Sequence, residues 1–205
     1  MPLDYENDDA ESREGGDGQD QRSFLLVLIG LGLTISAALG LGFLLKAPPL
    51  ANFSFTLVDG ALGVLATAPL VVMLAWMMRT NWTPVVRFRQ SQIEFLSTIG
   101  FEFTPLRIAV MSIGAGVSEE MLFRGVLQSW LHGFLPLWFA LIATNFVFGA
   151  LHARNAPYAI IAGLIGVYFG ALFAATSNLL TPIVTHAVYD AIAFDFTRRA
   201  LTARK

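Results

Sequence analysis

Long runs of apolar residues constrain this chain more than any other feature of its sequence. A helix needs about 20 residues to cross roughly 30 Å of hydrocarbon. Six runs approach that length: 24–45, 57–78, 106–131, 134–151, 157–175 and 179–197. The composition agrees, because 55% of the 205 residues are hydrophobic and only 14% are charged, which is too apolar for an ordinary soluble domain. We therefore predict an all-α, polytopic membrane protein with about six transmembrane helices.

The segments outside these runs divide the chain further. Residues 1–22 hold eight of the fifteen acidic residues and show no apolar periodicity, which predicts a disordered acidic tail. Residues 23–104 contain two predicted transmembrane helices and, at 85–100, an amphipathic stretch that we expect to lie at the membrane interface. The remaining four runs fall within 105–200. The chain has no cysteine, so disulfides, thiolate metal sites and a cysteine nucleophile are excluded.

The distribution of basic residues predicts the orientation. Six transmembrane helices would place eleven Lys and Arg residues on one side of the membrane and only Lys46 on the other, with Arg124 inside a helix. Because cytoplasmic loops carry the excess of positive charge, we expect both termini in the cytoplasm. An acidic segment precedes the first run and no small-residue cleavage site follows it, so that run is predicted to be a retained helix and not a signal peptide.

Charged residues lie inside two of the apolar runs. Glu119 and Glu120 follow Pro105 by 14 and 15 residues, roughly 21 Å along a helix axis and hence near the middle of the bilayer. At about 2.5–3.5 kcal/mol for each central charge, ionised Glu119, Glu120, Arg124 and Asp190 together cost roughly 10–14 kcal/mol. Pairing, protonation or a water-filled cavity must offset this free energy.

Helical spacing separates the two neighbouring glutamates. Glu120 and Arg124 are four residues apart and can pair on one face, whereas Glu119 is turned by about 100° and is predicted to be the free carboxylate. In the last run, His186 and Asp190 are also four residues apart. The sequence thus indicates one paired and one unpaired carboxylate in the third run.

Each of these residues also has a purely structural interpretation. A Glu–Arg pair can staple two turns of a helix, a lone helix histidine is more often a packed core group than a ligand, and Asp190 can pair with Arg198 or the arginine after it. We assign no chemistry to His132, and the spacing of Gly166 and Gly170 predicts close helix packing. A free carboxylate, two histidines and a second carboxylate on three separate runs are nevertheless poorly explained by chance.

Three short motifs carry a resemblance to a known family. EEMLFR at 119–124 fits EExxxR, FGALH at 148–152 fits FxxxH, and HAVYD at 186–190 fits HxxxN/D, in this order on successive runs. Residues 105–197 therefore resemble the CPBP family, the type II CAAX prenyl endopeptidase and bacteriocin-processing intramembrane proteases. The resemblance implies a membrane core at 105–200, a central polar cavity that opens toward the cytoplasm, and hydrolysis of a peptide bond within it.

The resemblance also implies a role for each motif residue. Glu119 and His152 would activate a water molecule, and His186 with Asp190 would hold the developing oxyanion. Glu120 and Arg124 would brace the site, and Phe148 would pack beneath His152. These roles agree with the needs of amide hydrolysis, which are a nucleophilic water, a base and donors for the oxyanion.

Asp190 leaves the mechanism open, because some family members carry Asn at this position. An ionised aspartate cannot donate a hydrogen bond to an oxyanion, so Asp190 is protonated, orients His186 or binds a metal. In the last case Glu119, His152, His186 and Asp190 would form a set that suits zinc. We expect either no cofactor or a single divalent metal, and we favour the metal-free mechanism.

Other classes of function remain compatible with the sequence. A transporter would also place Glu, His, Asp and Arg in the membrane, although it would usually show an internal repeat or broken helices. A non-catalytic family member acting as a chaperone or immunity factor is the other alternative. For a protease, the expected partners are the lipid bilayer and a peptide or protein substrate, prenylated or not, with no nucleic acid, in a prokaryotic cell membrane.

Overall fold

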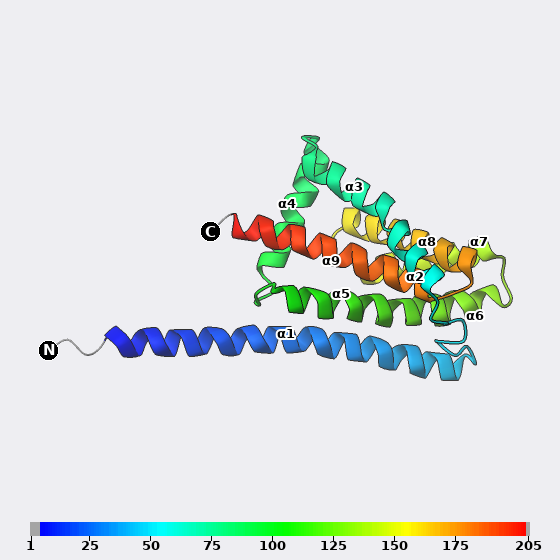
Figure 1. The fold of residues 1–205 in the computed structure, drawn as a ribbon, viewed down its shortest axis with the longest axis horizontal. Helices are drawn as coiled ribbons and strands as arrows, with labels where there is room; N and C mark the ends of the chain where they lie inside the picture. Colours follow the sequence, from blue (N-terminus) through cyan, green and yellow to red (C-terminus); the bar gives the residue numbers. More distant parts are fainter. Residues whose placement is uncertain (1–4, 204–205) are drawn as a thin grey trace.

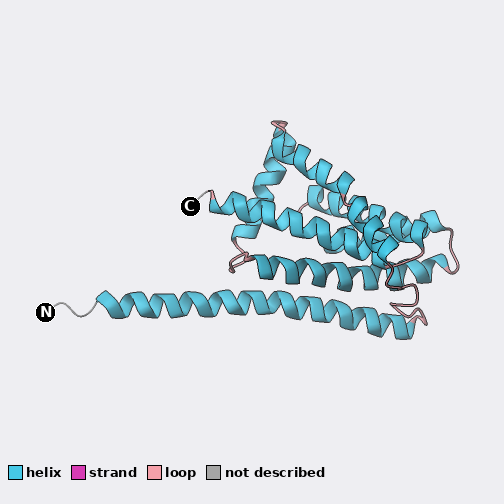
Figure 2. Cartoon of the chain, viewed as in Figure 1, coloured by secondary structure: helices cyan, strands magenta, loops and turns pink. Residues whose placement is uncertain are grey.

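The computed structural model describes residues 5–203, with side chains from residue 18 onward. All regular structure in this part of the chain is helical, and no strand occurs in it (Figure 2). Residues 5–22 of the predicted acidic tail are helical in the structure, as the start of the first helix, and Asp20 pairs with Arg107. The described helices are α1 (Tyr5–Leu44), α2 (Leu57–Ala66), α3 (Ala68–Arg79), α4 (Thr83–Ser97), α5 (Pro105–Glu120), η1 (Met121–Gln128), α6 (Ser129–His132), α7 (Leu137–Leu151), α8 (Ala156–Thr176) and α9 (Leu180–Thr202).

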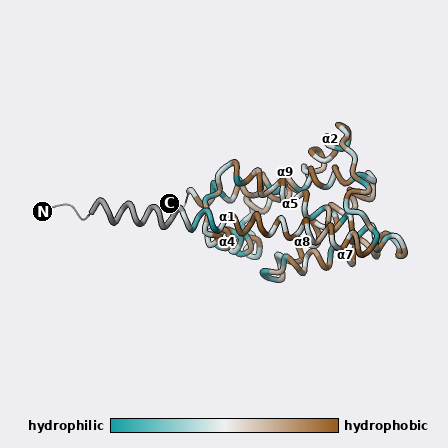
Figure 3. The backbone as a smooth tube through the Cα atoms, turned by 90° about the horizontal axis from the view of Figure 1, so that it is seen from below, coloured by the Kyte–Doolittle hydropathy of each residue, from teal (hydrophilic) through white to brown (hydrophobic). Residues whose placement is uncertain are grey.

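Each of the six predicted runs is helical. Three helical segments of the described chain are long and apolar enough to cross a membrane: Gly18–Leu44, Leu57–Arg79 and Ala156–Thr176, with Leu137–Leu151 as a shorter apolar helix. Apolar residues colour most of the bundle in Figure 3, and many large ones are exposed on its outside, such as Leu33 and Phe146. An apolar exterior of this kind is the surface that a lipid bilayer solvates. The chain is therefore an all-α, polytopic membrane protein.

Helix α9 lies at the centre of the bundle. It packs against α5, α2, α8 and α4, while α1 lies along α5 and η1 on the outer side, and α7 pairs with α8 (Figure 1). Glycines permit the closest approaches: a Cβ atom on Gly116 of α5 would lie 2.9 Å from the carbonyl oxygen of Ile183 in α9. Gly63 of α2 meets α9 in the same way, since its Cβ would lie 2.7 Å from Val184 Cβ. The Gly116 contact brings α5, which carries Glu119 and Glu120, against α9, which carries His186 and Asp190.

The second predicted run is not the continuous helix that its hydropathy predicts. Helix α2 ends at Ala66 and α3 begins at Ala68, with the buried Thr67 between them. Pro69 is the cause, because proline lacks the N–H that would bond to the preceding turn and its ring displaces that turn. The hydroxyl of Tyr168 donates to the carbonyl oxygen of Ala66 at 2.7 Å and so partly compensates for the break.

The third predicted run is also not one uniform helix. Residues Met121–Gln128 form a π-helix, η1, between α5 and α6. The hydroxyl of Ser129 donates to the carbonyl oxygen of Arg124 at 2.8 Å, which satisfies one acceptor in the widened turn. π-Helical turns inside α-helices occur frequently at functional sites, and this one begins directly after Glu120.

Helix α4 corresponds to the predicted interfacial stretch. It starts at Thr83 with Pro84 in its first turn and buries Val85 and Ile93. Figure 1 shows that α4 leaves the tip of α3, runs across α9 and returns toward the start of α5. It therefore covers one end of the bundle, and its position at the membrane interface stays a prediction.

The arginines of the connecting segments and Lys46 lie at opposite ends of the bundle. The α3–α4 connection, the start of α5, the α7–α8 connection and the end of α9 lie toward one end of the bundle, and the α1–α2, α6–α7 and α8–α9 connections lie toward the other (Figure 1). The first group carries arginines, whereas the second carries only Lys46 among its lysines and arginines. This arrangement is the one that the positive-inside rule requires for a single orientation.

The native chain has no cysteine, so single introduced cysteines report this orientation cleanly. Gln90 and Pro48 are both exposed and lie at opposite ends of the bundle. In intact cells, Gln90→Cys should be protected from an impermeant thiol reagent added outside, and Pro48→Cys should react. The opposite labelling pattern would show that the basic end faces outward.

Candidate functional site

A cavity of about 550 Å³ lies between α3, α4, α5, α7, α8 and α9. Most of its wall is apolar, with side chains such as Met77, Ile93 and Phe194. Its polar side chains include all four of the residues for which a direct chemical role was predicted: Glu119, His152, His186 and Asp190. The fold thus brings residues from three separate helical segments to one cavity in a largely apolar molecule.

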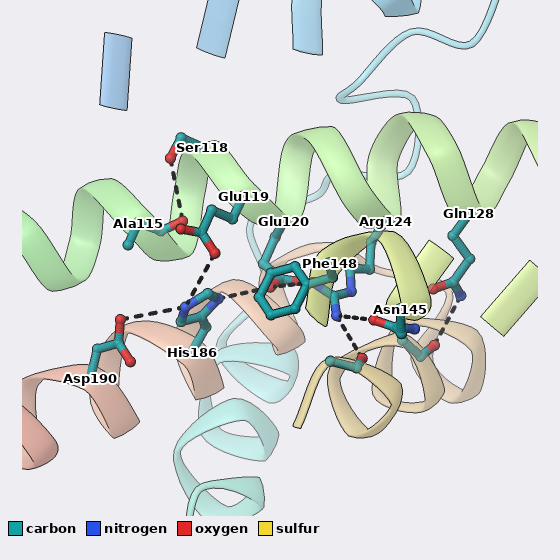
Figure 4. A network of polar contacts seen from close by, with 12 residues as sticks. Ala115, Ser118, Glu119, Glu120, Arg124, Gln128, Asn145, Phe148, His186 and Asp190 are labelled. Carbon is teal, nitrogen blue, oxygen red and sulfur yellow. Dashed lines mark hydrogen bonds and ion pairs between the residues drawn. The ribbon is translucent and has the colours of Figure 1, made fainter. Parts of the chain in front are cut away.

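Glu119 lies between the two histidines. Its Oε2 atom is 3.8 Å from His152 Nε2 and 4.0 Å from His186 Nε2. This oxygen is buried and has no hydrogen-bond partner among the described residues, whereas 21% of the side chain as a whole is exposed. Figure 4 shows Glu119 extending from α5 toward His186, apart from the neighbouring Glu120. A buried acceptor without a partner is where a bound water or substrate donor fits.

His152 is positioned by the end of helix α7. It is the residue directly after the last helical position, and its ring stacks on Phe148 with centroids 4.3 Å apart. Its Nδ1 atom lies 2.8 Å from the carbonyl oxygen of Phe148. Since a carbonyl oxygen only accepts, Nδ1 carries the proton and donates it there, which leaves Nε2 directed toward Glu119.

His186 is held more tightly than His152. Its Nδ1 atom lies 2.8 Å from Oε1 of the buried Glu120, and its ring stacks on Phe169 with centroids 4.8 Å apart. Its Nε2 atom is 3.4 Å from Asp190 Oδ2. The carboxylate of Glu120 fixes the proton on Nδ1 and the ring plane, so Nε2 faces both Glu119 and Asp190.

Glu120 and Arg124 form the predicted ion pair, and it is completely buried. Arg124 Nη1 donates to Glu120 Oε1 at 2.9 Å, and neither side chain is exposed. Arg124 Nη2 donates to Asn145 Oδ1 at 2.8 Å and to the carbonyl oxygen of Gly166 at 2.6 Å. The guanidinium also lies over the ring of Phe148, 5.1 Å from its centroid. These contacts offset the desolvation of both charges.

Gly166 and Gly170 have no side chain, which leaves room for the polar side chains that pack against them. A Cβ atom on Gly166 would lie 2.4 Å from Asn145 Oδ1, and one on Gly170 would lie 2.6 Å from Gln128 Oε1. Gln128 Nε2 donates to the carbonyl oxygen of Gly170 at 3.0 Å. The predicted close approach at this GxxxG pair therefore admits buried polar side chains, not only a bare helix–helix contact.

Two structural alternatives from the sequence have different outcomes. The one for His132 agrees with the structure, and the pairing of Asp190 with an arginine does not. His132 is exposed, with Nδ1 3.3 Å from the carbonyl oxygen of Leu135, and does not line the cavity. Arg198 and Arg199 both pair with Asp195. Asp190 therefore faces His186 and not these arginines.

Several residues of the site were not found from the sequence. Asn145 accepts from Arg124 of the buried pair, Gln128 donates to the carbonyl oxygen of Gly170 beside it, and Phe169 stacks on His186. Asn145 precedes His152 by seven residues, and Gln128 follows Arg124 by four, so each lies near the helix face of a residue with a predicted role. A polar side chain on such a face in an apolar run was the available signal. Helix α4 also lines the cavity, and nothing in its sequence indicated that.

The donor atoms suit zinc by type but not by spacing. Each histidine donates through Nδ1 to an oxygen, as metal-binding histidines do. Two ligands at 2.0–2.1 Å in a tetrahedral zinc site are about 3.3 Å apart, whereas Glu119 Oε2 lies 3.8 and 4.0 Å from the two Nε2 atoms. Within the described part of the chain, no group of three or more His, Asp or Glu residues is arranged to hold a metal ion. The distances from Glu119 to the two histidines are thus longer than in a formed zinc site, whereas His186 Nε2 and Asp190 Oδ2, 3.4 Å apart, are at the spacing of two zinc ligands.

The fold and the cavity define a class of protein: a polytopic membrane protein with a carboxylate and two histidines at the wall of an internal cavity. Residues 101–192, which run from the start of the α5 segment to the middle of α9, match the family described as type II CAAX prenyl endopeptidase Rce1-like. The chain is also 30% identical over 137 residues to the uncharacterized protein YpbD of Bacillus subtilis (strain 168), covering 63% of this chain and 67% of that protein. The chain belongs to the Rce1-like family, a family of membrane proteases.

No solved structure matches this chain. The matched residues contain Glu119, Glu120, Arg124, Phe148, His152, His186 and Asp190, which are the residues of the three motifs.

Proposed function

We propose that the protein is an intramembrane endopeptidase in which Glu119 and His152 activate a water molecule. The observation that carries the proposal is the position of Glu119 Oε2, a buried oxygen without a hydrogen-bond partner among the described residues, 3.8 Å from His152 Nε2. A water molecule at ordinary hydrogen-bond distance from both atoms, about 2.8 Å, fits this separation. Such a water has a base on one side and a second polar group to orient it.

The reaction proceeds in two proton transfers. Glu119 takes a proton from the water while the water oxygen attacks the carbon of the scissile carbonyl group. The carbonyl oxygen then becomes an oxyanion. Glu119 then gives the proton to the leaving amine as the C–N bond breaks, so the products are one carboxylic acid and one amine. The apolar wall of the cavity excludes bulk water and strengthens each electrostatic interaction.

His186 supplies the hydrogen bond to the oxyanion in this mechanism. Its Nδ1–H is bound to Glu120, so a second proton on Nε2 is the donor to the oxyanion, and Asp190 Oδ2, 3.4 Å from Nε2, shares this proton and stabilises the doubly protonated ring. Asp190 then acts as an acceptor that orients His186 and does not donate to the oxyanion itself. This assignment agrees with the inability of an ionised aspartate to donate and gives Asp190 and Asn equivalent roles at this position.

Glu120 and Arg124 act through His186. Neither side chain is exposed to the cavity, so neither contacts a substrate. Their pair holds His186 Nδ1 at 2.8 Å and so sets the direction of Nε2. We assign them a positioning role.

Two other functions, transport and a non-catalytic chaperone role, have less support. A transporter needs a polar pathway with access from both sides, whereas the site residues lie on one wall of a single cavity whose remaining wall is mostly apolar. A non-catalytic chaperone would not require an unpartnered carboxylate beside two oriented histidines. The family match supports hydrolysis over both.

The substrate is proposed to be a peptide or protein segment that enters from the cytoplasm. The cavity is lined by α4 and the α7–α8 connection, which lie at the arginine-rich end of the bundle. Similarity to a Bacillus subtilis protein supports a prokaryotic cell membrane as the location. A prenyl group on the substrate is compatible with the apolar wall but is not required by it.

The two neighbouring glutamates should respond differently to the same substitution. Purified protein in detergent is incubated with a peptide library, and products are followed by mass spectrometry. Glu119→Gln should lower turnover by about 100-fold or more, the usual contribution of general acid–base catalysis, without loss of thermal stability. Glu120→Gln should lower the free energy of unfolding by roughly 3–5 kcal/mol, because it leaves Arg124 as a buried charge with a weaker partner. Equal loss of activity at equal stability would contradict this division.

Asp190→Asn tests the metal-free mechanism. If Asp190 only orients His186, the asparagine variant should retain activity within a few-fold, because its amide oxygen still accepts from Nε2, and EDTA should affect neither protein. If Asp190 is a metal ligand, the variant should need more added zinc than the wild type after chelation. Stoichiometric zinc in wild-type protein, absent from a Glu119→Gln/His152→Ala double variant, would overturn the metal-free proposal.

A further inference from the structure

We propose that a groove between α5 and α9, on the outside of the bundle, binds one phospholipid with an anionic headgroup. The two helices lie side by side (Figure 1), and the groove between them has a volume of about 570 Å³. It is separate from the cavity of the candidate site, because Val188 and Ile192 of α9 line the groove, whereas Tyr189 and Asp190 line the cavity. The inference goes beyond the proposed peptidase function and does not depend on it.

Most of the groove is apolar and open to the surroundings of the bundle. Ala109 and Ile113 line it from α5, and Val188, Ile192 and Phe196 line it from α9. Ile113 and Phe196 are 59% and 40% exposed, and Ala109 is exposed as well. In a membrane protein, apolar side chains on the outside face lipid. The ligand of this part of the groove is therefore a hydrocarbon chain.

The end of the groove carries an excess of positive charge. Asp195 and Arg199 line it there, and Asp195 accepts hydrogen bonds from Arg198 Nε at 3.0 Å and from Arg199 Nε at 2.7 Å. One carboxylate cannot neutralise two guanidinium groups, and 73% of the Arg199 side chain is exposed. The sequence adds Arg204 and Lys205 shortly afterwards. Four basic residues at the end of a transmembrane helix that we predict to be cytoplasmic are typical of binding to anionic lipids.

The length of the groove matches one leaflet of a bilayer. Ala187 and Arg199 both line it, and the twelve positions between them correspond to about 18 Å along α9. Half of a bilayer, with its headgroups, is about 20 Å thick. A phospholipid can therefore place its phosphate beside Arg199 and an acyl chain along the groove toward Ala187.

A helix from a second copy or from another protein fits this groove less well than a lipid. A helix that is about 10 Å across occupies roughly 1,400 Å³ over a length of 18 Å, more than twice the volume of about 570 Å³ that the groove provides. A transmembrane helix also needs contacts over about 30 Å. An acyl chain is narrower, and the charge at only one end of the groove matches a molecule with one charged end.

A lipid in this groove would contact the two helices that hold the candidate site. Helix α5 carries Glu119, and α9 carries His186 on a face that does not line the groove. A ligand that binds only the folded protein raises its free energy of unfolding. Binding of an anionic phospholipid should therefore stabilise the packing of α5 against α9 without entering the cavity.

The first test measures thermal unfolding with two lipids. Protein in a neutral detergent is titrated with phosphatidylglycerol or with phosphatidylcholine, and unfolding is followed by circular dichroism. Phosphatidylglycerol at about ten times its Kd should raise Tm by roughly 3–6 °C, and phosphatidylcholine should raise it much less. Arg198→Gln/Arg199→Gln should lose most of this shift. Arg79→Gln/Arg87→Gln should keep it, because it removes the same charge from two exposed residues outside the groove.

The second test fills the groove without changing any charge. Ala109→Phe places a ring in it, whereas Val110→Phe adds the same kind of bulk to an exposed neighbour that does not line it. Native mass spectrometry should find one retained phosphatidylglycerol in wild type and Val110→Phe, and none in Ala109→Phe.

Three results would overturn the lipid site. They are an unchanged Tm shift in Arg198→Gln/Arg199→Gln, a lipid retained by Ala109→Phe, and a wild-type dimer that Ala109→Phe dissociates, since the dimer would put a second copy in the groove. Glu119→Gln should bind the lipid as wild type does. Failure of the lipid site is therefore distinguishable from failure of the proposed peptidase function.

Discussion

The buried ion pair of Glu120 and Arg124 is the interaction on which the rest of the structure depends. Two charges without exposure in a membrane protein need further hydrogen bonds to offset their desolvation, and here only Glu120 Oε2 and Arg124 Nε lack a partner among the described residues. Asn145 and the carbonyl oxygen of Gly166 accept hydrogen bonds from Arg124, and His186 donates one to Glu120. The pair thereby joins η1 to α7, α8 and α9 (Figure 4). Removing either charge would disturb three helices at once.

This pair also explains why two adjacent glutamates have different environments. Glu120 points into the bundle, where its carboxylate is completely buried. Glu119, one position earlier and rotated about 100° around the helix axis, points into the cavity, where one of its oxygens stays unpartnered among the described residues. The same local sequence thus provides a charge that orients His186 and a carboxylate that is free to react. The π-helical turn that follows lets Arg124 face α7 and α8 while α5 continues along α9.

Much of the fold was predictable because apolarity is a local property. The six runs, the Glu120–Arg124 pair and the stacking of Phe148 beneath His152 all follow from residues within one or two helical turns of each other. The break at Thr67 was also signalled locally, by Pro69, but a purely hydropathic criterion does not detect it. The π-helical turn at Met121–Gln128 has no comparable signal in the local sequence.

The parts of the site that could not be predicted depend on contacts between distant residues. Asn145 and Gly166 reach Arg124 from 21 and 42 positions away, and Gln92 reaches Arg154 from 62. Helix α4 was expected only at the membrane interface, because an amphipathic pattern does not reveal which surface its apolar face covers. Which helices lie side by side decides these contacts, and spacing along the chain does not.

The orientation of His186 tests the account most directly. The chain has three histidines, so ¹⁵N NMR of histidine-labelled protein, assigned by single substitutions, can resolve each ring. We expect His186 and His152 to carry a proton on Nδ1, donated to Glu120 and to the carbonyl oxygen of Phe148. Glu120→Gln should change the His186 signal and leave that of His152 in place. A His186 ring protonated on Nε2 alone would contradict the account, because Glu120 could not then hold the ring in position.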